Sequence, residues 1–437
     1  MSHSPNATHA VNNNNFLDNK KERPYTLILY GATSFVGQIT ARYLAQFLSG
    51  QEQQTVKWAI AGRNADKLEK LQSQLIQVNE VKIDIIIANT DDASSLDKMT
   101  AQTAVMISTV GPYLKYGEPL IKSCVENGTD YVDLTGEALF IKDMLDKYQD
   151  KAQQTGARIV NSCGFDSIPS DLGVYYTQQQ AQAIFDAACD TIHMRVKAAK
   201  GGLSGGTLSS MATVFEETEH NKTRRQQLTN PYLLNNDTNV PKVHQDNINK
   251  PHYDTEHKRW LAPFIMASIN TRIVHRSNQL LGYPYGRTFK YDEAMWMPDG
   301  VKGQLTSYGL SAGILGFIMA MSFKRSREFL SNHVLTKSGD GPSDAEQKNG
   351  YFDLRFFGTT ADKDTVTTKV TGNKDPGYGS TSQMLAQSAL CLAQDISKDA
   401  IDGGFWTPAS AMGNKLIERL NCHAGITFEV IENQPTS

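Results

Sequence analysis

The fold of this chain is decided by Tyr25-Thr-Leu-Ile-Leu-Tyr-Gly31-Ala-Thr-Ser34-Phe-Val-Gly37, which predicts a strand, a glycine-pivoted turn and the start of a helix. Gly31 permits a tight turn, Gly37 lets the helix pack close to the strand, and the helix N-terminus offers free N–H groups to a pyrophosphate. Ser34 replaces the middle glycine of the G-x-x-G-x-x-G pattern, so the strand–turn–helix context carries the prediction of a dinucleotide site. The predicted cofactor-binding residues in this loop are Gly31, Ala32, Thr33, Ser34, Phe35, Val36 and Gly37.

The dinucleotide is selected by the charge that follows the second predicted strand, in Trp58-Ala-Ile-Ala-Gly-Arg63. An acidic residue at this point would accept a hydrogen bond from the ribose 2′-hydroxyl of NAD. Arg63, with Asn64 and Lys67 beside it, instead suits the 2′-phosphate of NADP. The sequence therefore predicts NADP(H) as the cofactor.

The composition is that of an ordinary soluble protein, with 437 residues of which 40% are hydrophobic and 20% charged. The formal net charge of −3 argues against wholesale binding of nucleic acid. The five cysteines form no C-x-x-C pair and no metal-like cluster, which predicts reduced thiols in the cytoplasm and no metal site. Residues 1–23 are polar, so we expect a disordered tail and not a secretory signal.

Strand and helix patterns alternate over residues 24–175. Apolar strands separated by amphipathic helices predict an α/β fold, a Rossmann-type doubly wound parallel sheet with its ligand loops at the carboxyl ends of the strands. The predicted strands are Thr26–Tyr30, Val56–Ala61, Ile83–Ala88, Ala104–Val110, Tyr131–Leu134 and Arg158–Ser162. The predicted helices are Val36–Leu48, Ala65–Gln77, Ser94–Thr100, Pro119–Glu126 and Phe140–Gln153.

Residues 176–437 predict a second, α+β domain for substrate binding or dimerisation, with a C-terminal part able to pack back on the first domain. Its predicted strands include Thr191–Ala199, Ile426–Ile431 and an antiparallel pair formed by Tyr351–Gly358 and Thr365–Gly372. Gly403–Pro408 predicts a turn.

The stretch from Gly303 to Phe323 carries no charge and is followed at once by Lys324-Arg-Ser-Arg327. Its length approaches that of a membrane span. We expect a buried helix of the second domain, because the strongly apolar part covers only Leu310–Met321. The alternatives are a helix at a membrane surface, with peripheral contact through residues 303–327, and a true span.

Candidate catalytic residues lie on the predicted strand-end loops. Gly111, after the fourth strand, leaves room for a nicotinamide ring, and Tyr113 close by is the predicted proton donor. The Tyr-x-x-x-Lys signature of short-chain dehydrogenases occurs nowhere in the sequence. Asp133, Glu137 and Asp166 are further candidates, for which turn formation or helix capping is the simpler interpretation.

Several separate motifs carry a family resemblance. They are Gly31–Gly37, Trp58–Arg63, Val110-Gly-Pro-Tyr-Leu-Lys-Tyr-Gly-Glu-Pro119, Tyr131-Val-Asp-Leu-Thr-Gly-Glu137, Gly164-Phe-Asp-Ser-Ile-Pro-Ser-Asp-Leu-Gly173, Asp375-Pro-Gly-Tyr-Gly379 and Thr407-Pro-Ala-Ser-Ala-Met-Gly413. From Pro24 to its end, the chain resembles the saccharopine dehydrogenase-like oxidoreductases, including the bacterial trans-acting enoyl reductases. The usual family sequence has glycine in place of Ser34, whose hydroxyl can still face a phosphate.

The resemblance implies an NADP-binding Rossmann domain joined to a second α+β domain. For the enoyl-reductase branch it implies reduction of a carbon–carbon double bond in a lipid precursor, linked to glycolipid synthesis at the plasma membrane. We therefore expect an NADPH-dependent reductase of an apolar, lipid-derived enoyl or carbonyl substrate. Its expected location is the cytoplasm or the inner face of the plasma membrane, and a homodimer is an open alternative to a monomer.

Two other functions remain as alternatives. The first is a catalytically silent NADP-binding sensor or membrane-associated protein, favoured by the lack of an obvious acid–base pair. The second is a saccharopine-type amino-acid or imine dehydrogenase, although the sequence shows no arginine cluster with recognisable spacing for a dicarboxylate.

Overall fold

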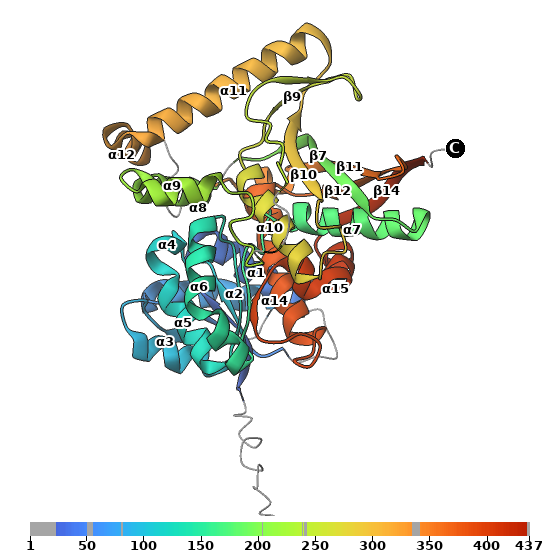
Figure 1. Cartoon of the computed structure of the whole chain (residues 1–437). Helices are drawn as coiled ribbons and strands as arrows, with labels where there is room; N and C mark the ends of the chain where they lie inside the picture. The colour runs from blue at the N-terminus through green and yellow to red at the C-terminus, as the bar shows by residue number, and fades with distance from the viewer. Residues whose placement is uncertain are drawn as a thin grey trace, which may run out of the picture.

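A computed structural model describes residues 23–49, 56–79, 82–202, 204–237, 239, 243–333 and 341–434. The predicted tail lies outside these residues except for Arg23. The described chain forms two seven-stranded sheets. Figure 1 shows the first sheet and its helices at the bottom, with the second sheet above them.

The first sheet is parallel, with the strand order β13-β6-β5-β4-β1-β2-β3. Its strands are β1 (Tyr25–Tyr30), β2 (Trp58–Gly62), β3 (Asp84–Ile87), β4 (Thr103–Ser108), β5 (Asp130–Asp133), β6 (Arg158–Val160) and β13 (Gly404–Trp406). Side chains of β1 alternate between two cores, since Leu27 and Leu29 join one cluster and Ile28 joins the other. The predicted Rossmann-type α/β class is confirmed.

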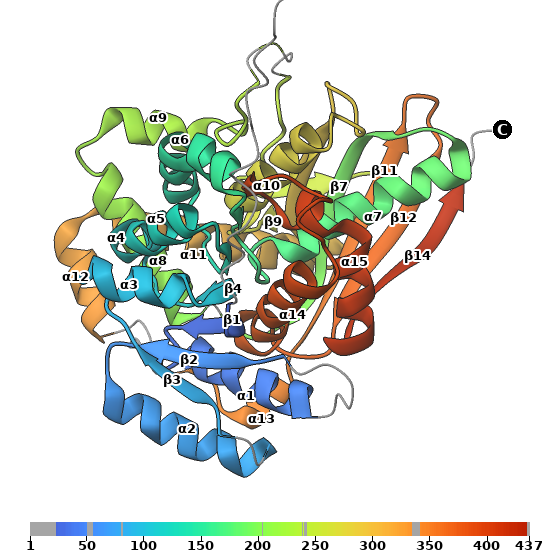
Figure 2. The ribbon, with the colours of Figure 1, turned by 90° about the horizontal axis from the view of Figure 1, so that it is seen from below.

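Helices cover both faces of the first sheet (Figure 2). One face carries α1 and α14, which pack against each other, and the other carries α3, α5 and α6. The helices of this unit are α1 (Phe35–Ser49), α2 (Ala65–Asn79), α3 (Ala93–Thr100), α4 (Tyr113–Tyr116), α5 (Glu118–Asn127), α6 (Ala138–Thr155), α14 (Thr381–Gln394) and α15 (Pro408–His423).

The second sheet is mixed, with the order β14-β12-β11-β7-β10-β9-β8 and one parallel pair, β7 with β10, among the described strands. Its strands are β7 (Cys189–Lys200), β8 (His252–Asp254), β9 (Arg259–Pro263), β10 (Lys290–Trp296), β11 (Tyr351–Thr360), β12 (Thr365–Gly372) and β14 (Ile426–Gln434). Its helical segments are α7 (Ile168–Phe185), α8 (Gly205–Thr218), α9 (Lys222–Thr229), α10 (Ala267–Leu280), α11 (Gly300–Ser322), α12 (Lys324–His333), α13 (Asp344–Lys348) and the π-helix η1 (Pro376–Ser380). The predicted antiparallel pair is confirmed as β11 with β12.

The C-terminal region returns to the first sheet, and the turn predicted at Gly403–Pro408 is wrong. Gly404, Phe405 and Trp406 pair in parallel with β6 and complete the sheet. A strand of three residues between glycine and proline carries almost no local pattern, so its pairing is decided by tertiary contacts.

The buried helix predicted for the uncharged stretch is also wrong. Helix α11 runs along the outer edge of the molecule (Figure 1), and its buried residues are Gly303, Ser307 and Met321. By length and composition it is the one helix in the described chain that could cross a membrane, and only 11% of its apolar window is buried.

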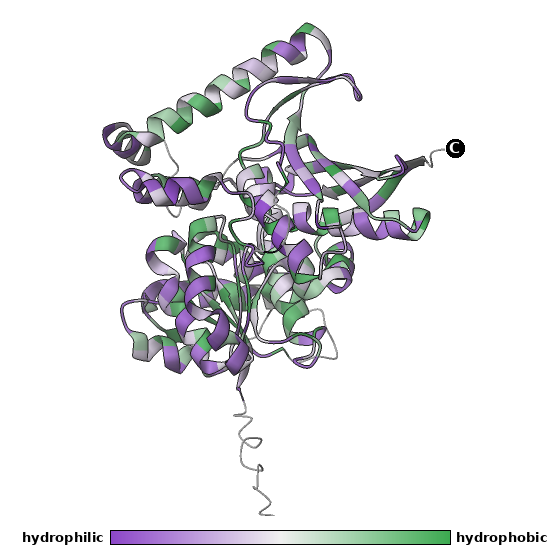
Figure 3. Cartoon of the chain, viewed as in Figure 1, coloured by the Kyte–Doolittle hydropathy of each residue, from purple (hydrophilic) through white to green (hydrophobic). Residues whose placement is uncertain are grey.

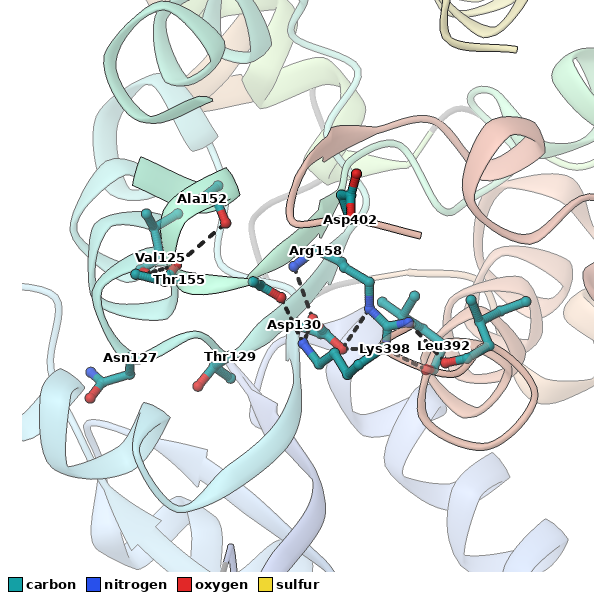
Figure 4. Close-up of polar contacts among 12 residues, drawn as sticks. Val125, Asn127, Thr129, Asp130, Ala152, Thr155, Arg158, Leu392, Lys398 and Asp402 are labelled. Atoms are coloured by element: carbon teal, nitrogen blue, oxygen red, sulfur yellow. Dashed lines mark hydrogen bonds and ion pairs between the residues drawn. The ribbon is translucent and has the colours of Figure 1, made fainter. Parts of the chain in front are cut away.

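A buried ion pair attaches the C-terminal return to the first sheet (Figure 4). Arg158, at the start of β6, donates from Nη2 to Asp130 Oδ2 at 2.5 Å and to the Leu392 carbonyl at 2.9 Å. Its Nη1 donates to the Ile396 carbonyl at 2.8 Å, while Lys398 Nζ lies 2.5 Å from Asp130 Oδ1. One guanidinium therefore joins β5, β6 and the segment that follows α14.

Replacing Arg158 by Met is expected to lower the free energy of unfolding by about 3–5 kcal/mol, because it leaves the Asp130 carboxylate buried without its main partner. Urea denaturation followed by circular dichroism measures this change. The matched control is Lys398→Met, which removes a half-exposed cation and should cost about 1 kcal/mol or less. Equal losses of unfolding free energy in the two variants would contradict the role of Arg158 as the main partner of Asp130.

Candidate active site

The loop between β1 and α1 has the geometry that a pyrophosphate site requires. Gly31 has a φ angle of +82°, and a Cβ atom there would lie 2.7 Å from Thr109 Oγ1. A Cβ atom on Gly37 would overlap the carbonyl oxygen of Gly31. Both positions therefore require glycine, one for its backbone conformation and space and the other for the close approach of helix and strand.

The hydroxyl of Ser34 faces the inside of this loop. It accepts a hydrogen bond from the Gly37 N–H at 3.0 Å and lies 3.0 Å from Thr109 Oγ1, so it caps α1. The N–H groups of Thr33, Phe35 and Val36 have no acceptor in the described chain. Free donors at a helix N-terminus fit a pyrophosphate, and Ser34 supports the loop that presents them.

The predicted 2′-phosphate residues lie at the carboxyl end of β2. Arg63 and Lys67 are exposed and form no ion pair within the described residues. Asn64 Oδ1 accepts a hydrogen bond from the Lys67 N–H at 2.8 Å and caps α2. Two unpaired cations at this point fit the 2′-phosphate of NADP.

Gly111 and Tyr113 follow β4 at the same edge of the sheet. Gly111 is exposed, whereas Tyr113 is only 5% exposed. The Tyr113 hydroxyl donates to the Ser108 carbonyl at 3.1 Å and accepts from the Leu134 N–H at 3.2 Å. Burial, and then the charge of Asp133, raise the pKa of this hydroxyl well above its usual value. This geometry does not favour Tyr113 as a proton donor, because the hydroxyl would have to leave both backbone partners.

Asp133, at the end of β5, holds two strand-end loops together. Its Oδ1 accepts from the N–H groups of Thr135 and Ser162, each at 3.0 Å. Its Oδ2 accepts from Asn161 Nδ2 at 2.8 Å and from the Tyr131 hydroxyl at 3.0 Å. Burial raises the pKa of Asp133 to about 6, against the effect of these donors. With both oxygens engaged, Asp133 is a positioning residue.

Glu137 connects the first domain to the second. Its carboxylate accepts from the N–H groups of Tyr113 at 2.9 Å and Leu114 at 2.8 Å. The Ser210 hydroxyl, on α8, donates to the same carboxylate at 2.5 Å. Nearby, Lys115 pairs with Glu216 of α8 at 2.8 Å. These contacts hold the loop after β4 against α8.

Asp166 differs from these two carboxylates because it has no hydrogen-bond partner among the described residues. It lies in the loop after β6, next to Gly136 and Met266: a Cβ on Gly136 would lie 3.6 Å from Asp166 Oδ2 and 3.8 Å from the Met266 side chain. Burial raises the pKa of Asp166 to about 7. The structure thus places a carboxyl group that has no hydrogen-bond partner in the described chain between the loop after β5 and the segment that precedes α10.

The sequence analysis did not identify the second-domain side chains that contact the loops at the carboxyl end of the first sheet. Ser210 on α8 and Asn270 on α10 approach it, and Asn270 bonds to Ser167 at 3.2 Å and to Glu293 at 2.9 Å. Neither residue belongs to a recognisable motif. Their positions depend on how the two sheets stack, which no local pattern encodes.

Comparison with known proteins agrees with this geometry. Residues 27–160 match the family described as the saccharopine dehydrogenase NADP binding domain, which confirms NADP(H) as the cofactor. A solved structure of saccharopine dehydrogenase (L-Glu forming) from Saccharomyces cerevisiae has a TM-score of 0.53 at 14% identity, and the match covers 93% of this chain and 100% of that one. That likeness shows a shared fold.

Two mycobacterial relatives match nearly the whole chain. A Mycobacterium tuberculosis protein whose name places it among the trans-acting enoyl reductases is 37% identical over 421 residues, 93% of this chain and 97% of the relative. The trans-acting enoyl reductase of Mycobacterium leprae is 34% identical over 413 residues, 91% of this chain and 96% of the relative. The predicted family resemblance is confirmed.

Arg63→Asp is expected to weaken NADPH binding at least tenfold, a loss of about 1.4 kcal/mol, and to improve NADH binding, because the carboxylate repels the 2′-phosphate and accepts from a 2′-hydroxyl. Fluorescence titration with both dinucleotides measures the two affinities. Arg287→Asp is the matched control, since Arg287 is an exposed arginine with no contact to the β1–α1 loop. Unchanged NADPH affinity in Arg63→Asp would refute the assignment.

Ser34→Ala is expected to lower the free energy of unfolding by about 1 kcal/mol through loss of the helix cap. Its NADPH affinity should stay within about threefold of the original, since the Ser34 hydroxyl is already engaged by the Gly37 N–H and Thr109. Thermal unfolding and NADPH titration on the same preparation separate the two effects. A large loss of affinity without loss of stability would instead give the hydroxyl a direct phosphate contact.

Proposed function

Because this chain belongs to the trans-acting enoyl reductase family, and is therefore an NADP-dependent oxidoreductase, we propose that it reduces an enoyl or carbonyl group of an apolar, lipid-derived substrate. The observation that carries the proposal is the Asp166 carboxyl group, which has no hydrogen-bond partner among the described residues. It lies at the carboxyl end of the first sheet, as does the loop between β1 and α1. A link to glycolipid metabolism and a cytoplasmic location remain predictions that follow from the resemblance.

Reduction of a carbon–carbon double bond needs a hydride on one carbon and a proton on its neighbour. Bound NADPH supplies the hydride. Asp166 is the side chain that we assign to the proton, because a pKa of about 7 leaves a large protonated fraction at neutral pH. The carboxyl proton passes to the substrate carbon that carries the developing negative charge, and the resulting carboxylate regains a proton from water.

Asp133 and Glu137, the carboxylates that flank the loop after β5, are less suited to that role. Both oxygens of Asp133 accept two hydrogen bonds each. Glu137 is held by two backbone N–H groups and a hydroxyl. A proton donor must approach the substrate with a free O–H, which leaves Asp166. Its presence also favours a working reductase over a catalytically silent sensor.

Two arginines of the second domain are engaged by the backbone, which fits an apolar substrate. Arg272 and Arg276, on α10, are buried and donate to backbone carbonyls: Arg272 to Leu228 and Asn230, and Arg276 to Leu234 and Phe405. Their guanidinium groups stabilise the fold and are not presented to a dicarboxylate. This arrangement disfavours the saccharopine-type alternative.

Asp166→Asn is expected to lower kcat by a factor of about 10²–10⁴ with NADPH affinity nearly unchanged, because the amide cannot deliver the proton. Tyr113→Phe should keep kcat within about fivefold of the original. Steady-state rates and NADPH titration measure both effects, and the opposite ranking of the two variants would restore Tyr113 as the donor.

The pH profile gives an independent check. If a protonated Asp166 is required, kcat should be highest below pH 7 and fall as the pH rises through about 7. The decline should be absent from the residual activity of Asp166→Asn. A profile that is unchanged in this variant would contradict the assignment.

The substrate class is tested by following the loss of nicotinamide absorbance with long-chain enoyl thioesters, ketones and imines. We expect the enoyl thioesters to be reduced fastest. Tight NADPH binding without oxidation by any compound would favour the sensor, and a preference for imines would favour the saccharopine-type alternative.

A further inference from the structure

Helix α11 presents an apolar surface that nothing else in the described chain covers. Its exposed side chains include Leu305 at 68% and Leu315 at 58% exposure. Val301, Tyr308 and Met319 are also exposed, and their spacing places them with these leucines on one side of a helix. Figure 3 shows hydrophobic bands along the helix. A continuous exposed apolar surface of this length marks an interaction site.

Three glycines of the same helix lie beside this surface and are open as well. Added Cβ atoms at Gly309, Gly313 and Gly316 would meet no atom within 4 Å. The main contacts of α11 within the described chain are with β9, α12 and α8. Its buried residues, Gly303, Ser307 and Met321, lie on the side away from the apolar surface.

The charges around α11 favour a membrane with anionic lipids as its partner. Residues 300–327 contain no acidic side chain, and Asp299 and Glu328 directly flank this stretch. Lys302 is exposed near the start of the helix, and Lys324 and Arg325 are exposed just after its end. An apolar helix with cations at both ends matches a bilayer whose headgroups are anionic.

A second copy of the chain fits this surface less well. Two helices related by a twofold axis would bring Lys302 either against the other Lys302 or against Lys324 and Arg325. Both arrangements bring cations of the two copies together, with only the flanking Asp299 and Glu328 to offset them, whereas anionic headgroups would neutralise all three cations.

Both ends of α11 are attached to the same folded body. Near the start, the Ser307 hydroxyl donates to the Leu261 carbonyl at 2.5 Å. Past the end, Arg327 donates to the Met321 carbonyl at 2.8 Å and to Glu219 at 2.7 Å. The helix is about 34 Å long, so a membrane span would carry its two ends to opposite sides of the bilayer and break these contacts.

We propose that α11 and the start of α12 form an interfacial anchor that lies flat on an anionic bilayer, with Leu305, Leu315 and Met319 among the acyl chains and the three cations at the headgroups. The proposal rests on α11 itself and does not depend on the substrate. The anchor is joined through Arg327 and Glu219 to α8, the helix whose Ser210 contacts Glu137 at the candidate active site.

Flotation of the full-length protein with vesicles tests the proposal. Vesicles of equal parts phosphatidylcholine and phosphatidylglycerol should carry the protein upward, and pure phosphatidylcholine should carry at least tenfold less. Release by alkaline carbonate is also expected, because the helix does not span the bilayer. Protein that stays in the soluble fraction with both vesicles, or that resists carbonate, would overturn the proposal.

The apolar contact is tested with Leu305→Ser/Leu315→Ser/Met319→Ser, which should lower binding to the anionic vesicles at least tenfold. Its control is Ile184→Ser/Ile431→Ser, which removes exposed apolar side chains elsewhere on the surface and should bind normally. NADPH affinity, measured on the same preparations, should be unchanged and reports correct folding. Equal vesicle binding by the triple variant and the control would refute the anchor.

The charge contribution is tested with Lys302→Glu/Lys324→Glu/Arg325→Glu, which should abolish the preference for anionic vesicles. The control reverses the charge of three exposed lysines of the first domain, namely Lys70, Lys98 and Lys151, and should retain the preference.

Sedimentation equilibrium tests for a second copy of the chain as the partner. A dimer that the triple serine variant dissociates would assign α11 to a second copy and overturn the proposal. Rates on a water-soluble enoyl thioester should be unaffected, which separates failure of the anchor from failure of the proposed reductase.

Discussion

The buried carboxylate of Asp133 is the constraint on which the arrangement of the candidate site depends. Three donors from the loops after β5 and β6, and the Tyr131 hydroxyl of β5, converge on it. A buried carboxylate with missing donors costs free energy, so the two loops are stable only in the arrangement that supplies all four. That arrangement places Glu137 against the loop after β4 and leaves Asp166 without a partner.

Each end of β5 carries a buried aspartate, and the two carboxylates have different surroundings. Asp130, at the amino end, is paired with Arg158 and Lys398, and these two cations compensate its charge. Asp133, at the carboxyl end, has neutral donors only, and burial raises its pKa to about 6. The cationic environment anchors the C-terminal return, whereas the neutral environment adds no positive charge at the carboxyl end of β5.

Much of the first domain is predictable from local pattern. The six strands within residues 24–175 lie close to their predicted positions because each is an apolar run between turn residues. Arg63 directly follows β2, the position at which a cofactor-selecting residue is predicted. The β1–α1 loop is predictable for a similar reason, since the positive φ angle of Gly31 and the close approach of Gly37 to the Gly31 carbonyl both arise within the loop.

The remaining features depend on contacts between distant segments. The hydroxyls of Ser34 and Tyr113 are directed by Thr109 and Leu134, residues far from them in sequence. The exposure of α11 could not be read from its composition, because an uncharged helix of this length also suits a protein core. Strand β13 has too few residues to show a period.

The completion of the first sheet by β13 also determines when that sheet can form during synthesis. Its pairing joins Arg158–Val160 to Gly404–Trp406, so the ribosome must release most of the polypeptide before the sheet acquires its last strand. Contacts between such distant segments form late, since a long loop must close first. Until then one edge of the nascent sheet is bare and open to pairing with other chains. A newly made molecule is therefore most in need of chaperone protection during the interval between the emergence of β6 and the arrival of β13.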